Sequence, residues 1–486
     1  MSKTLKEKTA DSIVWSFLDR FGQQGISIIV WIILMRYFLA PSDYALIGMI
    51  GIVNALGYVL VDSGFSNALI RKQEVTQTDL SSVFYFNILL GVLFYLLVFC
   101  CAPLFTLYFN QPALTNLARV VALNIPLNAL TLVQGTLLAK ALRFKQLAAT
   151  GLIAYFCSGC VILFLAWKGL GFWVLAIQPL SANIVRNICL WSFNRWRPTI
   201  EYSINSIKNL WNYSSKLLLT STITVIFNNI YVFFIGKIYP INDTGYYSQA
   251  NKYSDLAYST ITMSFQSVLY PTLASIGAHD SEGLKKAMRK IVRVSAFVIL
   301  PLMMGLIAIA EPFVTTLLSA KWLPIVPYLQ ILCIGYLFIG LTSSYNNILF
   351  VKGLSSTFLT FNILYRVAIL LSIVLTMYHG IKVMLMAWSI VAILYAVALM
   401  IFVGRKIKYT LWEQVKDILP YFTLALGMGS GVFILSYWIE KHTVLFILQL
   451  IAGATFYLGA TYLLGSKVFR EVIEMMKLKL LKQNNN

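Results

Sequence analysis

The sequence predicts an all-α integral membrane protein with about fourteen transmembrane helices. Of its 486 residues, 59% are hydrophobic and only 12% are charged, whereas a soluble protein has about 25% charged residues. Apolar stretches long enough to cross a bilayer recur from one end of the chain to the other. The first, residues 13–34, is too long for the apolar core of a cleavable signal peptide. The connections between the stretches are short, so we expect no large soluble domain.

The distribution of basic residues fixes the number and direction of the helices. With fourteen crossings and a cytoplasmic N-terminus, most lysines and arginines lie in cytoplasmic loops, as the positive-inside rule requires. Both termini are then cytoplasmic, and the net charge of +20 needs no nucleic-acid partner. The predicted spans are 13–38, 44–64, 80–108, 117–138, 147–167, 170–193, 211–236, 246–273, 294–318, 325–350, 357–377, 383–403, 418–440 and 443–464.

Two matched segments indicate an internal repeat. Trp15 is followed five residues later by Arg20, and Trp211 is followed five residues later by Lys216. Helices one to six and seven to twelve then form two pseudo-symmetric halves of parallel topology, which predicts a substrate site between them. The predicted division is a cytoplasmic N-terminal segment (1–12), an N-terminal six-helix lobe (13–193), a cytoplasmic linker (194–210), a C-terminal six-helix lobe (211–404), two additional helices (405–466) and a basic cytoplasmic tail (467–486).

The matched cations predict a binding site for an anionic group. A cation inside a membrane helix costs about 2.5–3.5 kcal/mol on insertion scales, so Arg20 and Lys216 require a functional or structural reason. Arg186 lies near the cytoplasmic end of the sixth helix, where we expect its side chain to reach the interface. Further candidates for a polar cavity are Gln23, Gln24, Asn228, Asn229 and Lys252. The candidate coupling or structural acids are Asp19, Asp62 and Asp255.

The sequence offers little for catalysis or metal binding. It contains no phosphate-binding GxxxxGK[ST] loop, no HExxH pair and no nucleophile elbow with a partnering histidine. Cys157 and Cys160 have CxxC spacing, but they lie within a predicted membrane helix and have no histidine nearby. We therefore expect a transporter rather than an enzyme, without a cofactor or a metal.

Several segments resemble those of polysaccharide exporters. They are ILMRYFLAPSDY (33–44), VDSGFSNALI (61–70), KALRFK (140–145), and GYYSQANKY (245–253) with VLYPTLAS (268–275). On these segments the chain resembles the Wzx-type polysaccharide flippases. The branch is that of the colanic-acid and teichuronic-acid exporters, within the multidrug/oligosaccharidyl-lipid/polysaccharide exporter superfamily.

The resemblance implies a flippase of the bacterial cytoplasmic (inner) membrane. It would move a polyprenyl-pyrophosphate-linked oligosaccharide, such as an O-antigen, capsule or exopolysaccharide repeat unit, from the inner to the outer leaflet by alternating access. Arg20 and Lys216 would bind the pyrophosphate, and the polar candidates would bind the sugar. Implied partners are the lipid-linked glycan, membrane lipids, a polysaccharide polymerase and glycosyltransferases.

Three alternatives remain open. A multidrug/cation antiporter of the same superfamily would need a carboxylate deep in the membrane, and the sequence shows no clear candidate. A membrane polysaccharide polymerase would need a large extracytoplasmic loop, and the predicted outer loops are short. A lipid II flippase would share the topology and differ in the headgroup that it accepts.

Overall fold

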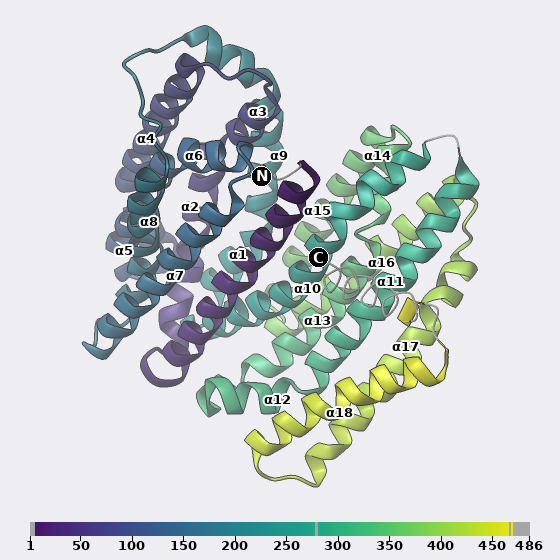
Figure 1. Cartoon of the computed structure of the whole chain (residues 1–486). Helices are drawn as coiled ribbons and strands as arrows, with labels where there is room; N and C mark the ends of the chain where they lie inside the picture. The colour runs from purple at the N-terminus through teal and green to yellow at the C-terminus, as the bar shows by residue number, and fades with distance from the viewer. Residues whose placement is uncertain (1–4, 278–279, 466–467, 470–486) are drawn as a thin grey trace. The chain divides into compact units, whose positions relative to one another are not determined.

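The computed structural model of the chain is helical, with no strand among the residues that it describes (Figure 1). It describes the backbone of residues 5–277, 280–465 and 468–469. Within these ranges, the side chains of residues 5–13, 209, 212–213, 216, 261 and 263–272 are not described. The predicted basic tail, 467–486, lies almost wholly outside the described residues. The all-α prediction is confirmed.

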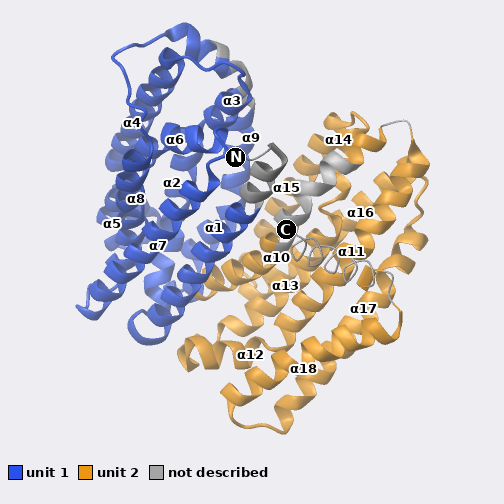
Figure 2. Ribbon diagram, in the orientation of Figure 1, with its two compact units in different colours: residues 1–245 blue, residues 246–486 orange. Residues whose placement is uncertain are grey.

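The chain divides into two compact units, residues 1–245 (unit 1) and residues 246–486 (unit 2) (Figure 2). Unit 1 includes α9 (Ile204–Ile238), the seventh predicted span, which packs against α2 (Pro41–Asp62) and α4 (Gln77–Phe109). Compactness therefore places a boundary some 50 residues beyond residue 193, where the predicted N-terminal lobe ends. The predicted division into two repeats describes a duplication within the sequence. It does not describe compact units, and it stays a prediction.

The helices of unit 1 begin with a long helix that carries Arg20 and Gln23. The full set is α1 (Leu5–Ile33), the π-helical end of the same segment (Leu34–Phe38), α2 (Pro41–Asp62), α3 (Phe65–Arg71), α4 (Gln77–Phe109), α5 (Ala113–Ala122), α6 (Asn124–Lys140), α7 (Phe144–Trp167), α8 (Trp173–Phe193) and α9 (Ile204–Ile238).

The helices of unit 2 begin with α10, whose first residues belong to unit 1. The full set is α10 (Ile241–Ile276), α11 (Ser281–Ala308), α12 (Ala310–Phe313), a π-helical turn (Val314–Leu318), a 3₁₀ turn (Ala320–Trp322), α13 (Ile325–Thr342), α14 (Tyr345–Val351), α15 (Ser355–Thr376), α16 (Ile381–Lys406), α17 (Leu411–Ile434), a 3₁₀ turn (Leu435–Tyr437) and α18 (His442–Leu463).

Twelve helical segments in the described part of the chain are long and apolar enough to cross a membrane. The predicted sixth and eighth spans, which correspond to α8 and α10, are not among the twelve. In α8 the apolar run is interrupted by Asn183, Arg186 and Asn187. The multi-pass architecture is confirmed, whereas the count of fourteen and the cytoplasmic termini stay predictions.

Local sequence explains where several helices begin. The Thr76 hydroxyl accepts a hydrogen bond from the Asp79 backbone N–H, and the Asp79 carboxylate accepts one from Thr76 N–H, which forms a capping box for α4. Thr410 and Glu413 do the same for α17. Pro41 occupies the first turn of α2, where its missing N–H costs nothing.

The segment between α8 and α9 is held against α4 by hydrogen bonds. The Trp196 indole N–H donates to Gln77 Oε1 at 2.7 Å, and the Thr78 hydroxyl donates to Glu201 Oε2 at 2.7 Å. The Ser203 backbone N–H donates to the Ser82 hydroxyl at 2.8 Å. This predicted linker therefore has a fixed course, and α9 already begins inside it, at Ile204.

In unit 2 an ionic cluster attaches α17 to α11. The Asp417 side chain is only 4% exposed and accepts hydrogen bonds from Arg289 and Arg293, with N···O distances of 2.6–3.1 Å. The Tyr409 hydroxyl donates to the same carboxylate at 2.8 Å. Burial and this hydrogen bond raise the pKa of Tyr409 above its usual range, so the phenol stays a donor. The predicted additional helices are thus firmly joined to α11.

Tyr457 adds a second attachment, from α18. Its hydroxyl donates to the Phe297 carbonyl of α11 at 2.9 Å, and the two rings lie with centroids 5.6 Å apart. The additional pair of helices therefore contacts α11 through both of its members.

We predict that Asp417→Asn destabilises the protein by about 1–3 kcal/mol, because the substitution leaves two arginines without their carboxylate. Thermal unfolding in detergent measures the effect as a lower midpoint temperature. The matched control is Glu282→Gln, which breaks the exposed pair with Lys286 on the same α11, where the side chains are 76% and 78% exposed. A fully exposed pair of this kind adds little to stability, so equal shifts for the two variants would contradict the prediction.

Candidate functional site

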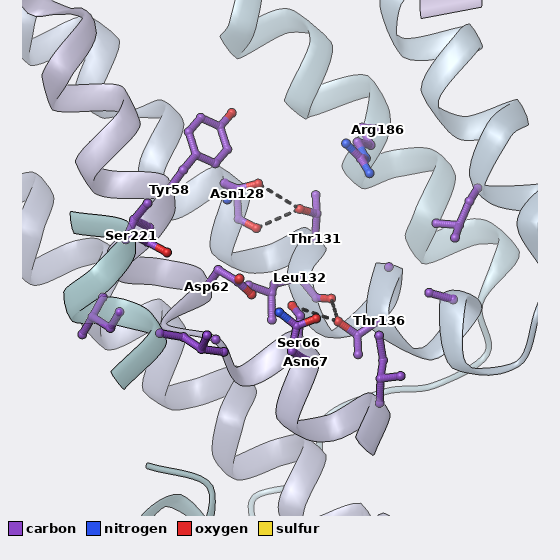
Figure 3. A pocket seen from close by; sticks show the side chains of 18 residues that line it. Tyr58, Asp62, Ser66, Asn67, Asn128, Thr131, Leu132, Thr136, Arg186 and Ser221 are labelled. Atoms are coloured by element: carbon purple, nitrogen blue, oxygen red, sulfur yellow. Dashed lines mark hydrogen bonds between the residues drawn. The ribbon is translucent and has the colours of Figure 1, made fainter. Parts of the chain in front are cut away.

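A polar cavity of about 610 Å³ lies within unit 1. Its wall is formed by α2, α3, α6, α8 and α9, with one leucine from α7. The volume is in the range of about 300–1,000 Å³ that is common for small-ligand sites. Figure 3 shows the side chains directed toward this space. The polar side chains of the lining are Tyr58, Asp62, Ser66, Asn67, Asn128, Thr131, Thr136, Arg186 and Ser221.

A break between α2 and α3 gives the cavity one of its edges. Ser63 and Gly64 both adopt left-handed conformations, with φ of 43° and 76°. A Cβ atom at Gly64 would lie 3.3 Å from the backbone of Ser214 in α9, so glycine also permits the close approach of this helix. Because of the break, Asp62 at the end of α2 and Ser66 at the start of α3 both line the cavity.

An amide–phenol network supports the cavity on the side of Tyr58. The Tyr58 hydroxyl accepts hydrogen bonds from Asn124 Nδ2 at 2.8 Å and from Asn183 Nδ2 at 3.0 Å. Asn183 Nδ2 also donates to Asn124 Oδ1 at 2.6 Å. The network joins α2, α6 and α8 inside the unit, and it leaves the hydroxyl proton of Tyr58 available to a ligand.

Two charged residues of the cavity lining each have one buried side-chain atom without a hydrogen-bond partner among the described residues. The Oδ1 atom of Asp62 and the Nε atom of Arg186 are both buried and unpaired. Arg186 interacts electrostatically with Asp19 of α1, so its charge is partly balanced. In Figure 3 Arg186 stands apart from the group formed by Tyr58, Asn128 and Asp62. Unpaired charged atoms of this kind are costly within a membrane, which makes the cavity a functional candidate.

The predicted polar face of the first helix contributes no residue to the lining of this cavity. Arg20 is exposed on α1 and does not line the cavity. Gln23 donates a side-chain hydrogen bond to Asp19, so these two residues are partners on successive turns. Gln24 is half-buried. Gly151 of α7 allows the close approach, since a Cβ atom there would overlap Gln23.

The second predicted cation belongs to the same unit as the first. Lys216 lies on α9, and its side chain is outside the described residues, whereas its neighbours Leu217 and Leu218 line the cavity. Asn229 Nδ2 donates to the Val225 carbonyl of its own helix at 2.8 Å, and Asn228 is exposed. The pairing of Arg20 with Lys216 in one site stays a prediction.

The remaining candidates lie in unit 2. Lys252 is half-buried and Asp255 is exposed, both on α10. Their assignments as sugar-binding and coupling residues stay predictions. Among the described residues no cluster of three or more histidine, cysteine or acidic side chains could hold a metal ion.

Arg186 lines the cavity, whereas the sequence led us to expect its side chain at the interface. Tyr58, Asn128 and Thr131 also line the cavity, and the sequence did not single them out. The available signal was the series Asn183, Arg186, Asn187, which repeats polar residues every three or four positions along one face of α8.

Comparison with known proteins identifies the family. Residues 33–327 match the family described as polysaccharide biosynthesis protein. This chain belongs to that family. Relatives include the succinoglycan biosynthesis transport protein ExoT of Rhizobium meliloti, 26% identical over 69% of this chain and 68% of that protein. Another is the lipopolysaccharide biosynthesis protein WzxC of Escherichia coli, 23% identical over 90% of this chain and 86% of that protein.

Solved structures share the fold of this polysaccharide biosynthesis protein. The inward closed conformation of the lipid II flippase MurJ superposes with a TM-score of 0.75, at 17% identity, over 95% of this chain and all of that one. An inward-facing multidrug resistance MATE family transporter gives 0.63, at 14% identity, over 82% and 98%. The predicted resemblance is confirmed, and the membrane-length helices place this family member in the bacterial inner membrane as a multi-pass protein.

We predict that Tyr58→Phe destabilises the protein by about 1–3 kcal/mol, because Asn124, which is fully buried, loses the acceptor of its Nδ2. Thermal unfolding of the purified protein measures this. The control is Tyr85→Phe on α4, where the ring is 36% exposed, as for Tyr58. We expect a shift of less than about 0.5 kcal/mol for the control. A Tyr58→Phe protein as stable as wild type would show that the network does not support unit 1.

Proposed function

We propose that this chain is a flippase for polyprenyl-pyrophosphate-linked oligosaccharide. It moves a repeat unit of an O-antigen, capsule or exopolysaccharide from the inner to the outer leaflet of the cytoplasmic membrane by alternating access. The relatives ExoT and WzxC carry names of polysaccharide transport and biosynthesis, which supports the substrate class. A polysaccharide polymerase and glycosyltransferases would be the partners that use and supply the substrate.

The observation that carries the proposal is the polar cavity of unit 1. Most of its wall is built from helices that are long and apolar enough to cross a membrane, yet it contains a carboxylate, a guanidinium, amides and hydroxyls. A purely structural bundle would not leave charged atoms such as Asp62 Oδ1 and Arg186 Nε unpaired in such surroundings. A transporter of a hydrated headgroup needs polar groups of this kind, because they replace water as the headgroup enters the membrane.

The headgroup also needs cations for its pyrophosphate, and we assign this role to Arg20 and Lys216. Both lie on helices of unit 1, at matched positions of the predicted repeat. Arginine and lysine form charge-assisted hydrogen bonds to phosphate oxygens. The membrane potential, negative inside, would assist the outward step by about 2.3 kcal/mol per charge per 100 mV.

The competing proposal is a cation antiporter, since a MATE transporter shares the fold. An exporter of cations would favour a site with a net negative charge. The lining of the cavity of unit 1 contains one carboxylate and one guanidinium, so it has no net negative charge, and this observation favours the glycolipid over a cation.

We predict that Arg20→Ala and Lys216→Ala each lower polysaccharide export in cells at least 10-fold, because a lost charge-assisted hydrogen bond costs about 1.5–3 kcal/mol. Surface polysaccharide is measured in a strain that lacks the chromosomal gene and carries the variant. Native mass spectrometry of the purified protein tests retention of the pyrophosphate lipid beside a cationic dye.

The matched control is Arg119→Ala. Arg119 lies on α5 with its guanidinium 4.2 Å from the ring centroid of Phe99, away from the cavity lining. Export should stay near the wild-type level in this variant, with equal amounts of all proteins in the membrane. Normal export by both Arg20→Ala and Lys216→Ala would reject the pyrophosphate assignment, and retention of the dye instead of the lipid would favour the antiporter.

A further inference from the structure

The cavity lining combines hydrogen-bond donors and acceptors in a balanced set. On the acceptor side, the carboxylate of Asp62 belongs to the lining, and its buried Oδ1 atom has no partner among the described residues. On the donor side, the guanidinium of Arg186 belongs to the lining, and its buried Nε atom likewise has no partner among the described residues. Ser66 and Ser221 add hydroxyls, which both donate and accept.

Two further lining residues carry donor hydrogens that no described residue accepts. Both acceptor positions of the Tyr58 hydroxyl are used by Asn124 and Asn183, so its proton points elsewhere. The Oδ1 atom and the backbone carbonyl of Asn128 accept from the Thr131 hydroxyl at 3.4 and 2.8 Å. That contact orients the amide, and its Nδ2 has no acceptor among the described residues. Figure 3 shows Tyr58, Asn128 and Asp62 along one side of the cavity.

This set does not match a phosphate. A phosphate group only accepts hydrogen bonds at neutral pH, so its site needs donors and cations throughout. Asp62 is an unpaired carboxylate in the same lining and would repel the phosphate. A cationic ligand meets the opposite difficulty, because Arg186, Tyr58 and Asn128 present donors.

A sugar ring satisfies both requirements at once. Each hydroxyl of a sugar donates one hydrogen bond and accepts up to two, and neighbouring hydroxyls can share a carboxylate or a guanidinium. The volume of about 610 Å³ suits a group of this size.

We propose that the cavity of unit 1 is a subsite for an uncharged sugar residue of the substrate, separate from the groups that bind the pyrophosphate. Asp62 accepts from sugar hydroxyls, while Arg186, Tyr58 and Asn128 donate to them. This inference rests on the proposed flippase function, and it names the part of the substrate that enters the cavity.

The test measures binding of a lipid-free sugar to the full-length protein in detergent. The probe is a neutral oligosaccharide obtained by mild acid hydrolysis of the producing strain's surface polysaccharide, with binding measured by saturation-transfer NMR. We expect Asp62→Asn and Arg186→Gln each to weaken binding about 10-fold or more, because each removes a charged hydrogen-bonding group. Inorganic pyrophosphate should not displace the probe.

The controls remove the same charges outside the cavity lining, with Glu74→Gln in the exposed α3–α4 loop and Arg119→Gln on α5. Both should bind the probe as wild type does. If Asp62→Asn or Arg186→Gln does not fold, Asn128→Ala replaces it, with the same loss expected. Displacement of the probe by pyrophosphate, equal binding by all variants, or no binding by wild type would each overturn the sugar subsite.

Export in cells separates this inference from the proposed function. If wild type restores surface polysaccharide but the lipid-free sugar does not bind, the subsite is rejected and the flippase stands. If the sugar binds at Asp62 and Arg186 but the chain restores no export, the flippase proposal fails and the sugar site remains.

Discussion

A polar side chain inside a membrane must have a hydrogen-bonding partner or face a polar space. The two units meet this constraint in different ways. In unit 2, Asp417 receives hydrogen bonds from two arginines and a tyrosine, so its charge is balanced locally. In unit 1, Asp62 and Arg186 keep atoms without partners among the described residues, and both line a cavity. The first arrangement holds helices together, and the second places two charged residues in the wall of a cavity.

The same constraint explains which helices are easy to recognise. Most membrane helices of this chain are apolar on nearly all sides, and their lengths follow directly from hydropathy. The helix α8 is an exception because Asn183, Arg186 and Asn187 interrupt it. Asn183 joins the network around Tyr58 and Arg186 lines the cavity, so the residues that weaken the membrane signal are those that build the site.

Sequence reasoning could therefore predict the helical architecture and the family, but only part of the site. The repeated spacing from Trp15 to Arg20 and from Trp211 to Lys216 is visible without a structure, and so are the motifs around Pro41 and Gly245. The cavity depends on the break at Ser63–Gly64 and on the rotation of α8 about its axis. Hydropathy encodes neither the break nor the rotation. Turning a helix about its axis by the angle between two successive residues moves a side chain from the lipid to the interior.

The cluster around Asp417 bears on how a chain of this length could be shortened. Ending the chain before α17 would remove the carboxylate that Arg289 and Arg293 share and would leave two guanidiniums on a helix of membrane length. It would also remove Tyr457, which is bonded to the backbone of α11. A relative without α17 and α18 would thus need different residues at positions 289 and 293. The last two helices and the two arginines of α11 therefore depend on each other, and we expect a relative to have both or neither.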